Sequence, residues 1–329
     1  MKNHIYIYSP SSAVRNKAHF KKGVQRLKKL GYDVEVDEAA LSKYQRFAGD
    51  DAVRIAAIDR AASSGASVAL ISRGGYGLTR LLPAIGYKGV AKAIDKGTRF
   101  VGLSDFTAFQ MAVLAKTGRS TWAGPAMATD FGDSDTPDDI MEACFDDLMT
   151  GSGEGAGWQL PKPAAKPVAG DAAGALAGAL ASGRRVNAPE GALEVKNAVL
   201  WGGNLSVIAA LVGTPYMPPI KGGILFLEDD GEHPYRVERM LTQLLLAGVL
   251  AQQKAIVLGQ FTRFKPALGY DSGFGMASVA ARLQGQVKAQ VLTGLPFGHV
   301  PTKVCLPFGV KTSLIVEGRD AFLLWGHAH

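Results

Sequence analysis

The first half of the chain alternates short apolar runs with stretches of helical periodicity, and this alternation constrains the fold more than any other feature. Strand-like runs are expected at residues 5–8, 34–36, 68–72 and 99–103, and helices at residues 17–30, 51–64 and 106–116. Strands separated by helices join through right-handed crossovers into a parallel sheet. We therefore predict an α/β fold whose N-terminal part is a doubly wound, mostly parallel sheet.

The composition shifts toward Gly, Ala, Pro and Ser between residues 151 and 185, a pattern typical of a linker or a surface excursion. We therefore divide the chain into an N-terminal α/β domain at 1–150, an Ala/Gly/Pro-rich linker at 151–185 and a C-terminal mixed α/β domain at 186–329. In the C-terminal domain, strands are expected at 198–201, 223–227, 254–260 and 313–325, helices at 205–212 and 235–248, and a Gly-Gly-Asn turn at 202–204.

Composition and charge argue against several classes of protein. No stretch approaches the roughly 18–20 uninterrupted apolar residues of a membrane helix, and the apolar run near the N-terminus is too short for a signal peptide, so we expect a cytoplasmic protein. The net charge of +7 comes from dispersed lysines and arginines without a nucleic-acid-binding module, which favours anionic small substrates over nucleic acid. Cys144 and Cys305 are far apart and no metal-binding spacing occurs, so we expect no disulfide, metal or cofactor.

Ser104 follows an expected strand in the run Val101-Gly-Leu-Ser-Asp-Phe106 and leads directly into a helix. A serine at a strand-to-helix turn has the layout of a nucleophile elbow, in which the hydroxyl is exposed above the edge of the sheet. The elbow usually closes with a second glycine, whereas Phe106 occupies that position here. The alternative is that Ser104 or Asp105 only caps the following helix.

A nucleophilic serine needs a base, and the base needs a group that orients it. Of the six histidines, His233 and His299 have the more suitable surroundings, and His299 lies in a loop stiffened by two prolines and a glycine. Glu228 ends an apolar, strand-like run and is the strongest candidate for the acid, with Asp229 and Asp230 as rivals.

An oxyanion hole needs backbone donors that side chains do not obstruct. Gly74 and Gly75 follow an expected strand and meet this need, and the N–H of Asp105 would supply a second donor. The same glycine-rich run matches neither the dinucleotide-binding spacing nor the P-loop. Cys305 with His299 is a rival nucleophile pair, but Cys305 lies in an apolar run that is typical of a buried, inert thiol.

A set of motifs occurs along the chain in a fixed order. They are Tyr8-Ser-Pro-Ser11; Ser72-Arg-Gly-Gly-Tyr-Gly77 followed by Arg80-Leu-Leu82; Gly102-Leu-Ser-Asp-Phe-Thr107; Gly202-Gly-Asn-Leu-Ser206; Gly213-Thr-Pro-Tyr216; Leu225-Phe-Leu-Glu-Asp229 with Pro234-Tyr-Arg236; and Gly298-His299. This ordered set closely resembles the LD-carboxypeptidases, a family of serine peptidases that also contains the microcin C immunity peptidases. The resemblance covers nearly the whole chain apart from 151–185, and the family's elbow lacks the closing glycine, so Phe106 no longer counts against Ser104.

The resemblance implies a catalytic triad of Ser104, His299 and Glu228, with an oxyanion hole at Gly75 and Asp105. It implies release of the terminal D-alanine from a muropeptide tetrapeptide, at the bond between meso-diaminopimelate and D-Ala, during peptidoglycan recycling. It also implies a homodimer of two-domain chains. The candidate substrate-binding residues are Arg73, Tyr76, Asn204 and Arg236, and the two arginines would hold substrate carboxylates.

Two alternatives stay open. The first is the same catalysis on another substrate, as in a microcin C-type immunity peptidase that cleaves a peptidyl- or aminoacyl-nucleotide. The second is a non-enzymatic ligand-binding protein on a doubly wound scaffold, in which Ser104, Glu228 and His299 would lie far apart.

Overall fold

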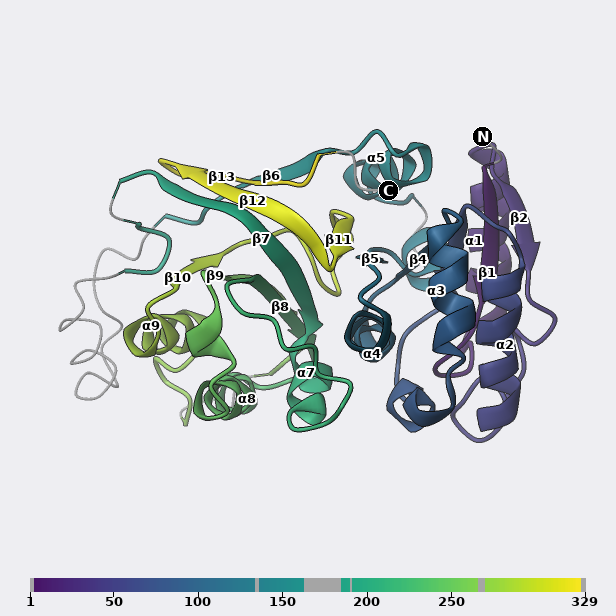
Figure 1. The fold of residues 1–329 in the computed structure, drawn as a ribbon, viewed down its shortest axis with the longest axis horizontal. Helices are drawn as coiled ribbons and strands as arrows, with labels where there is room; N and C mark the ends of the chain where they lie inside the picture. The colour runs from purple at the N-terminus through teal and green to yellow at the C-terminus, as the bar shows by residue number, and fades with distance from the viewer. Residues whose placement is uncertain (1–2, 134–135, 163–184, 190, 266–269, 327–329) are drawn as a thin grey trace.

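The computed structural model describes residues 3–133, 136–162, 185–189, 191–265 and 270–326, and it contains two sheets with helices packed against them (Figure 1). The first sheet has the strand order β11-β5-β4-β3-β1-β2. Its strands are β1 (His4–Tyr8), β2 (Asp33–Val36), β3 (Val68–Ile71), β4 (Arg99–Gly102), β5 (Thr121–Ala123) and β11 (Leu306–Phe308). All neighbouring pairs are parallel except β11 and β5, which are antiparallel, so the predicted doubly wound sheet is confirmed.

Helices cover both faces of this sheet because alternate side chains of each strand point to opposite faces. In β1, Ile5 and Ile7 join a buried cluster with residues of α1 and α5, whereas Tyr6 and Tyr8 join the cluster that includes residues of α2, α3 and α4. The helices are α1 (Lys17–Lys29), α2 (Asp51–Ser63), α3 (Tyr87–Asp95), α4 (Thr107–Thr117) and α5 (Asp139–Thr150). Short helical turns connect them: η1 (Leu78–Arg80), η2 (Leu82–Ala84), η3 (Ser104–Phe106) and the π-helical turn η4 (Met127–Phe131).

The second sheet mixes parallel and antiparallel strands in the order β10-β9-β8-β7-β12-β13-β6. Its strands are β6 (Gly155–Gln159), β7 (Leu193–Asn204), β8 (Ile224–Asp230), β9 (Ala255–Thr262), β10 (Gln290–Thr293), β12 (Val310–Glu317) and β13 (Asp320–Leu324). The strands from β10 to β7 are parallel, and those from β7 to β6 are antiparallel. The helices α7 (Leu205–Leu211), α8 (Pro234–Leu246) and α9 (Met276–Gln286) and the turn η5 (Leu250–Gln252) accompany them. This confirms the predicted mixed α/β C-terminal part.

The two sheets share one hydrophobic core through α4. This helix lies between them, contacts α7 and β7, and is buried at every residue from 107 to 113 (Figure 1). A helix that is apolar all round fits such a position because it packs against partners on both sides. The residue that precedes this helix by three positions, Ser104, is therefore fixed relative to both sheets.

The structure corrects several sequence-based expectations. The Gly-Gly-Asn run at 202–204 is the end of strand β7 and not a turn. Glycine is needed here for close packing of strands, since a Cβ at Gly202 would lie 1.8 Å from the carbonyl oxygen of Phe226 on the neighbouring strand. The expected strand at 313–325 is instead two strands, β12 and β13, that reverse at Gly318 with a φ of 61°.

The boundary segment also differs from a plain linker. Residues 155–159 of the expected 151–185 linker form β6 at the edge of the second sheet, whereas residues 163–184 lie outside the described residues. Conversely, strand β11 lies in the C-terminal part of the chain but belongs to the first sheet, where it pairs with β5. Across the described ranges, no helix combines the length and apolar character needed to cross a membrane.

The loop between β10 and β11 is attached to the first sheet's helices by two polar contacts. Lys303, of which 2% of the side chain is exposed, pairs with Asp130 of η4 at 2.5 Å, and Thr302 donates a hydrogen bond to Asp138 at 2.5 Å. A buried ion pair is costly to break because one charge is then left without its partner in a poorly solvated place. This loop, which carries His299, thus leaves β10 of the second sheet and is held on the N-terminal part of the chain before it enters β11 of the first sheet.

Candidate active site

Ser104 lies at the turn between β4 and α4, with a φ of 65°. This left-handed conformation is uncommon for a residue other than glycine and is strained, so the surrounding packing must impose it. The N-cap positions of η3 and α4 are occupied by Leu103 and Phe106, and neither helix has a side-chain capping hydrogen bond, so the capping alternative loses support. A half-buried serine at a strained turn between a parallel strand and a helix is the geometry of a nucleophile elbow.

Asp105 turns its side chain away from α4 and toward the glycine-rich loop after β3. Its buried carboxylate accepts a hydrogen bond from the N–H of Leu78 at 2.9 Å. Burial raises the pKa of Asp105, although the backbone N–H groups at Leu78 and Gly77 and the charge of Arg54 act in the opposite direction. The carboxylate thus fixes the glycine-rich loop beside the serine.

Gly74 brings bare backbone against the elbow, and the adjacent Gly75 brings it against the loop that follows β1. A Cβ at Gly74 would lie 2.7 Å from the Cβ and 3.0 Å from the Oγ of Ser104. A Cβ at Gly75, where φ is 116°, would lie 2.3 Å from the Oγ of Ser12. Both positions therefore require glycine, and the loop has the unobstructed backbone that an oxyanion hole needs.

Glu228 and His299 form a contact at the carboxyl edge of the second sheet. Nδ1 of His299 lies 2.8 Å from Oε2 of Glu228, which is completely buried. Burial by itself lowers the pKa of His299, but the hydrogen bond and charge of Glu228 outweigh it, and the net pKa is raised. The approach depends on Gly298, whose φ is 140° and where a Cβ would lie 3.3 Å from the Cβ of Glu228.

The two rival carboxylates have other partners. Asp229 accepts hydrogen bonds from Asn204 at 2.9 Å and from the backbone and hydroxyl of Ser206 at 2.8 and 2.6 Å. Asp230 pairs with Arg263 and accepts a hydrogen bond from Thr262. Among the described residues, the carboxylate that is hydrogen-bonded to His299 is therefore that of Glu228.

Asn204 connects the elbow to this pair. Its backbone N–H donates to Oγ1 of Thr107, in the first turn of α4, at 3.0 Å, and its Nδ2 donates to Oε1 of Glu228 at 3.3 Å. The close approach requires Gly203, where a Cβ would lie 2.6 Å from the same Thr107 oxygen. A line of contacts thus runs from the helix that follows Ser104, through Asn204 and Glu228, to His299. Sequence reasoning did not identify Thr107, since only the fold shows that its hydroxyl meets β7.

The other possible bases and nucleophiles are differently placed. His233 precedes α8, and its Nε2 lies 3.0 Å from Oδ2 of Asp271. Cys305 is buried, and burial raises the pKa of its thiol well above the ordinary value. A thiol with a raised pKa is a poor nucleophile because the thiolate is the reactive form, so the Cys305–His299 alternative loses support.

The candidate substrate-binding residues fall into three environments. Arg73 and Tyr76 lie on the glycine-rich loop, the first half-buried and the second 47% exposed. Asn204 is buried, and its side chain already contacts Glu228, Asp229 and the N–H of Val207. Arg236 is on α8, and within the described part of the chain its polar contacts are with Tyr235 and Glu232.

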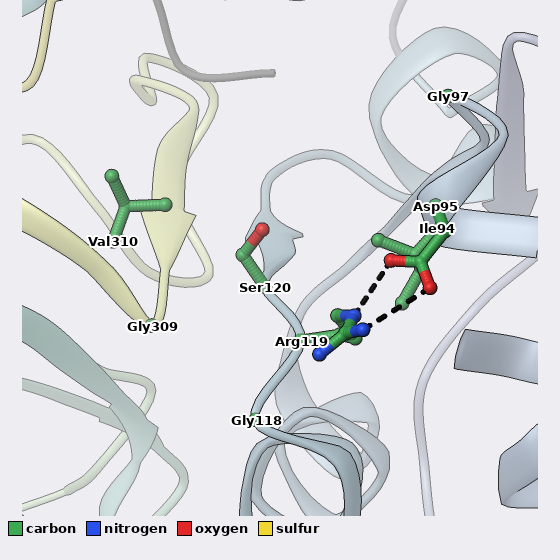
Figure 2. A pocket seen from close by; sticks show the side chains of 8 residues that line it. All are labelled: Ile94, Asp95, Gly97, Gly118, Arg119, Ser120, Gly309 and Val310. Carbon is green, nitrogen blue, oxygen red and sulfur yellow. Dashed lines mark hydrogen bonds and ion pairs between the residues drawn. The ribbon is translucent and has the colours of Figure 1, made fainter. Parts of the chain in front are cut away.

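A cavity of about 350 Å³ lies where strands β4 and β5 of the first sheet begin, at the edge opposite the carboxyl ends of the strands (Figure 2). Its lining includes Gly97, which precedes β4, and Gly118 to Ser120, which precede β5, and Arg119 there pairs with Asp95 at 2.6 Å. Ser104 follows the carboxyl end of β4, so this cavity is separate from the elbow. Ligands of open α/β sheets bind at the carboxyl ends of the strands, which favours the Ser104 edge as the site.

Comparison with known proteins gives one consistent family. A model of the LD-carboxypeptidase N-terminal domain matches residues 5–124, and a model of the LD-carboxypeptidase C-terminal domain matches residues 197–314. A candidate carboxypeptidase from Synechocystis is 30% identical over 94% of this chain and 90% of its own length. The microcin C7 self-immunity protein MccF of Escherichia coli is 28% identical over 75% of this chain and 70% of its own length.

A solved structure agrees with these matches. The muramoyltetrapeptide carboxypeptidase from Oxalobacter formigenes superimposes with a TM-score of 0.81 and 35% sequence identity, over 98% of each chain. A non-enzymatic ligand-binding protein does not fit this set of relatives. The chain therefore belongs to the LD-carboxypeptidase family of serine peptidases, as its ordered motifs predicted, and is a hydrolase of the carboxypeptidase type.

Proposed function

We propose that this protein releases the terminal D-alanine from muropeptide tetrapeptides by cutting the bond between meso-diaminopimelate and D-Ala, in cytoplasmic peptidoglycan recycling. The observation that carries the proposal is the contact of His299 with the buried Glu228, joined through Asn204 and Thr107 to the helix that Ser104 precedes. The resemblance to a solved muramoyltetrapeptide carboxypeptidase supports the substrate class. The homodimer remains a prediction of the family resemblance.

The proposed reaction is acyl transfer to Ser104. Its hydroxyl attacks the carbonyl on the diaminopimelate side while His299 accepts the proton through Nε2, since Nδ1 faces Glu228. His299 then protonates the departing D-alanine amine, and the same histidine activates the water that hydrolyses the acyl-enzyme. Among the described residues the Ser104 hydroxyl forms no hydrogen bond, and the contact that His299 makes there is with Glu228. Catalytic hydrogen bonds are often long without substrate and tighten in the complex.

Backbone N–H groups at Gly75 and Asp105 are the proposed oxyanion donors. The glycine loop and the elbow lie in contact, because the position of a Cβ at Gly74 is 3.0 Å from the Ser104 hydroxyl. Backbone donors fixed in this way stabilise negative charge as it develops, and removal of one such donor typically lowers kcat by about 10²–10³-fold.

An assay with two substrates tests the proposal. The purified protein is offered a free muropeptide tetrapeptide and, separately, microcin C, with D-alanine and processed nucleotide measured by mass spectrometry. We expect the protein to release D-alanine. In Ser104→Ala the rate of release should fall by several orders of magnitude while the far-ultraviolet circular dichroism spectrum is unchanged. Turnover of microcin C alone would instead favour the immunity-peptidase activity, which the similarity to MccF supports.

Gly74→Ala tests the contact between the glycine loop and the elbow. The φ of Gly74 is outside the left-handed region, so alanine can adopt the backbone, but its Cβ would lie 2.7 Å from the Cβ of Ser104. We expect kcat to fall by at least about 10²-fold, since a displacement near 1 Å has that effect on a catalytic group. Gly89→Ala in α3 is the control, because its Cβ would meet no atom within 4 Å and should leave kcat unchanged. Equal kcat values for the two variants would contradict the proposed oxyanion geometry.

Glu228→Gln tests how the histidine is tuned. The base must be neutral, so kcat/KM should rise with pH through the pKa of His299, and Glu228 raises that pKa. Removing the charge should shift the acidic limb of the profile to lower pH and lower kcat by roughly 10³–10⁴-fold, as in other triads. Glu238→Gln, which alters a carboxylate that faces Arg282, should leave the limb in place. An unmoved limb in Glu228→Gln would mean that another group sets it.

A further inference from the structure

Three loops at the carboxyl edge of the first sheet are tied to one another. They follow β1, β2 and β3 in the chain. The N–H of Ala13 donates to the carbonyl oxygen of Arg46 at 2.9 Å, and the N–H of Ala48 donates to that of Ser11 at 3.1 Å. The N–H of Tyr76 donates to Oγ of Ser12 at 3.0 Å. These bonds make the three loops one surface.

Each of the three loops carries an arginine on this surface. Arg73 is half-buried and donates from Nη1 to the carbonyl oxygen of Ala13 at 3.0 Å, and Arg46 lies 5.5 Å from the centre of the Tyr76 ring. Burial lowers the pKa of Arg73, and the charges of Arg15 and Arg46 lower it further, so both of these guanidinium groups act on Arg73 as like charges.

This arginine cluster, Arg15, Arg46 and Arg73, forms no ion pair with an acidic side chain among the described residues, and the charges that shift the pKa of Arg73 are those of Arg15 and Arg46. Neighbouring arginines do: Arg80 pairs with Asp51 at 3.0 Å, and Arg60 pairs with Asp37 at 2.8 Å. Arg15 and Arg46 are exposed, and the paired loops bring their charges near Arg73. Like charges repel one another, and an anion placed among them would relieve that repulsion.

The cluster lies where a ligand is expected. The strand order 2-1-3-4-5 reverses direction between β1 and β3, and open α/β sheets bind ligands in the crevice at this point. The cluster is also close to the elbow. A Cβ at Gly75 would lie 3.7 Å from Nη2 of Arg73, and a Cβ at the adjacent Gly74 would lie 3.0 Å from the Ser104 hydroxyl.

We propose that Arg15, Arg46 and Arg73 form a carboxylate-binding site that takes the C-terminal carboxylate of the peptide to be cut. The inference rests on the proposed function and names how a carboxypeptidase of this kind recognises a chain end. The leaving residue carries its carboxylate one residue beyond the scissile carbonyl, and guanidinium groups bind carboxylates through paired, charge-assisted hydrogen bonds. The cluster thereby selects a free chain end over an internal peptide bond.

The experiment compares a tetrapeptide that ends in D-alanine with the same peptide ending in D-alaninamide. Release of D-alanine or D-alaninamide is measured for the wild type and for Arg73→Met. We expect the variant to lose about 10- to 100-fold in kcat/KM, mainly through KM, on the acid and to change little on the amide. Arg73→Lys, which keeps the charge, should recover part of the loss.

Two further variants separate recognition from loop structure. Arg15→Met with Arg46→Met leaves the Arg73–Ala13 hydrogen bond intact and should show the same selective loss on the acid. Arg80→Met removes an equal charge from a neighbouring, paired position and should affect neither substrate selectively. A loss that is equal for acid and amide, or absent in the cluster variants, would overturn the inference. Failure of the wild type to release D-alanine at all would overturn the proposed function, and the inference with it.

Discussion

The hydrogen bond from the N–H of Asn204 to Oγ1 of Thr107 joins the two sheets at the point where the rest of the site is assembled. On one side of it, α4 begins three residues after Ser104; on the other, Asn204 contacts Glu228, which contacts His299. A catalytic group displaced by about 1 Å loses much of its effect, so a site shared by two sheets needs such a fixed contact. The Lys303–Asp130 pair holds the histidine loop on the first sheet's side and is therefore a second fixed contact between the two parts of the site.

Close backbone approach is the second requirement of this arrangement. Gly203 admits the Thr107 hydroxyl, Gly298 brings the histidine loop against Glu228, and Gly74 lies against Ser104. Gly203 and Gly298 have φ values of 112° and 140°, which only glycine adopts readily, and Ser104 itself is held at 65°. Strain of this kind persists where surrounding packing over-determines it, and such strain concentrates at functional sites. The high glycine content of the chain thus has a specific use at the meeting of the two sheets.

The sequence predicted the fold class well because strand and helix periodicities are local properties. Ser104, Glu228 and His299 could be named because each lies within a motif of the ordered set, and the contact of His299 with Glu228 agrees with that prediction. Contacts between distant segments were beyond reach. Nothing local to Thr107 indicates Asn204, nothing near Lys303 indicates Asp130, and Arg15 and Arg46 join Arg73 only through loop pairing. The Gly-Gly-Asn run was misread because glycines that allow close packing of strands look the same as glycines in turns.

The most direct test of the account is covalent labelling with a fluorophosphonate, followed by intact-mass and peptide mass spectrometry. The account predicts one phosphonyl group per chain, attached to Ser104, and a rate at least about 10²-fold lower in His299→Ala, because proton removal by a positioned base contributes that much or more. Attachment to another residue, or an undiminished rate in a folded His299→Ala protein, would contradict the claim that Ser104 and His299 act together across the two sheets.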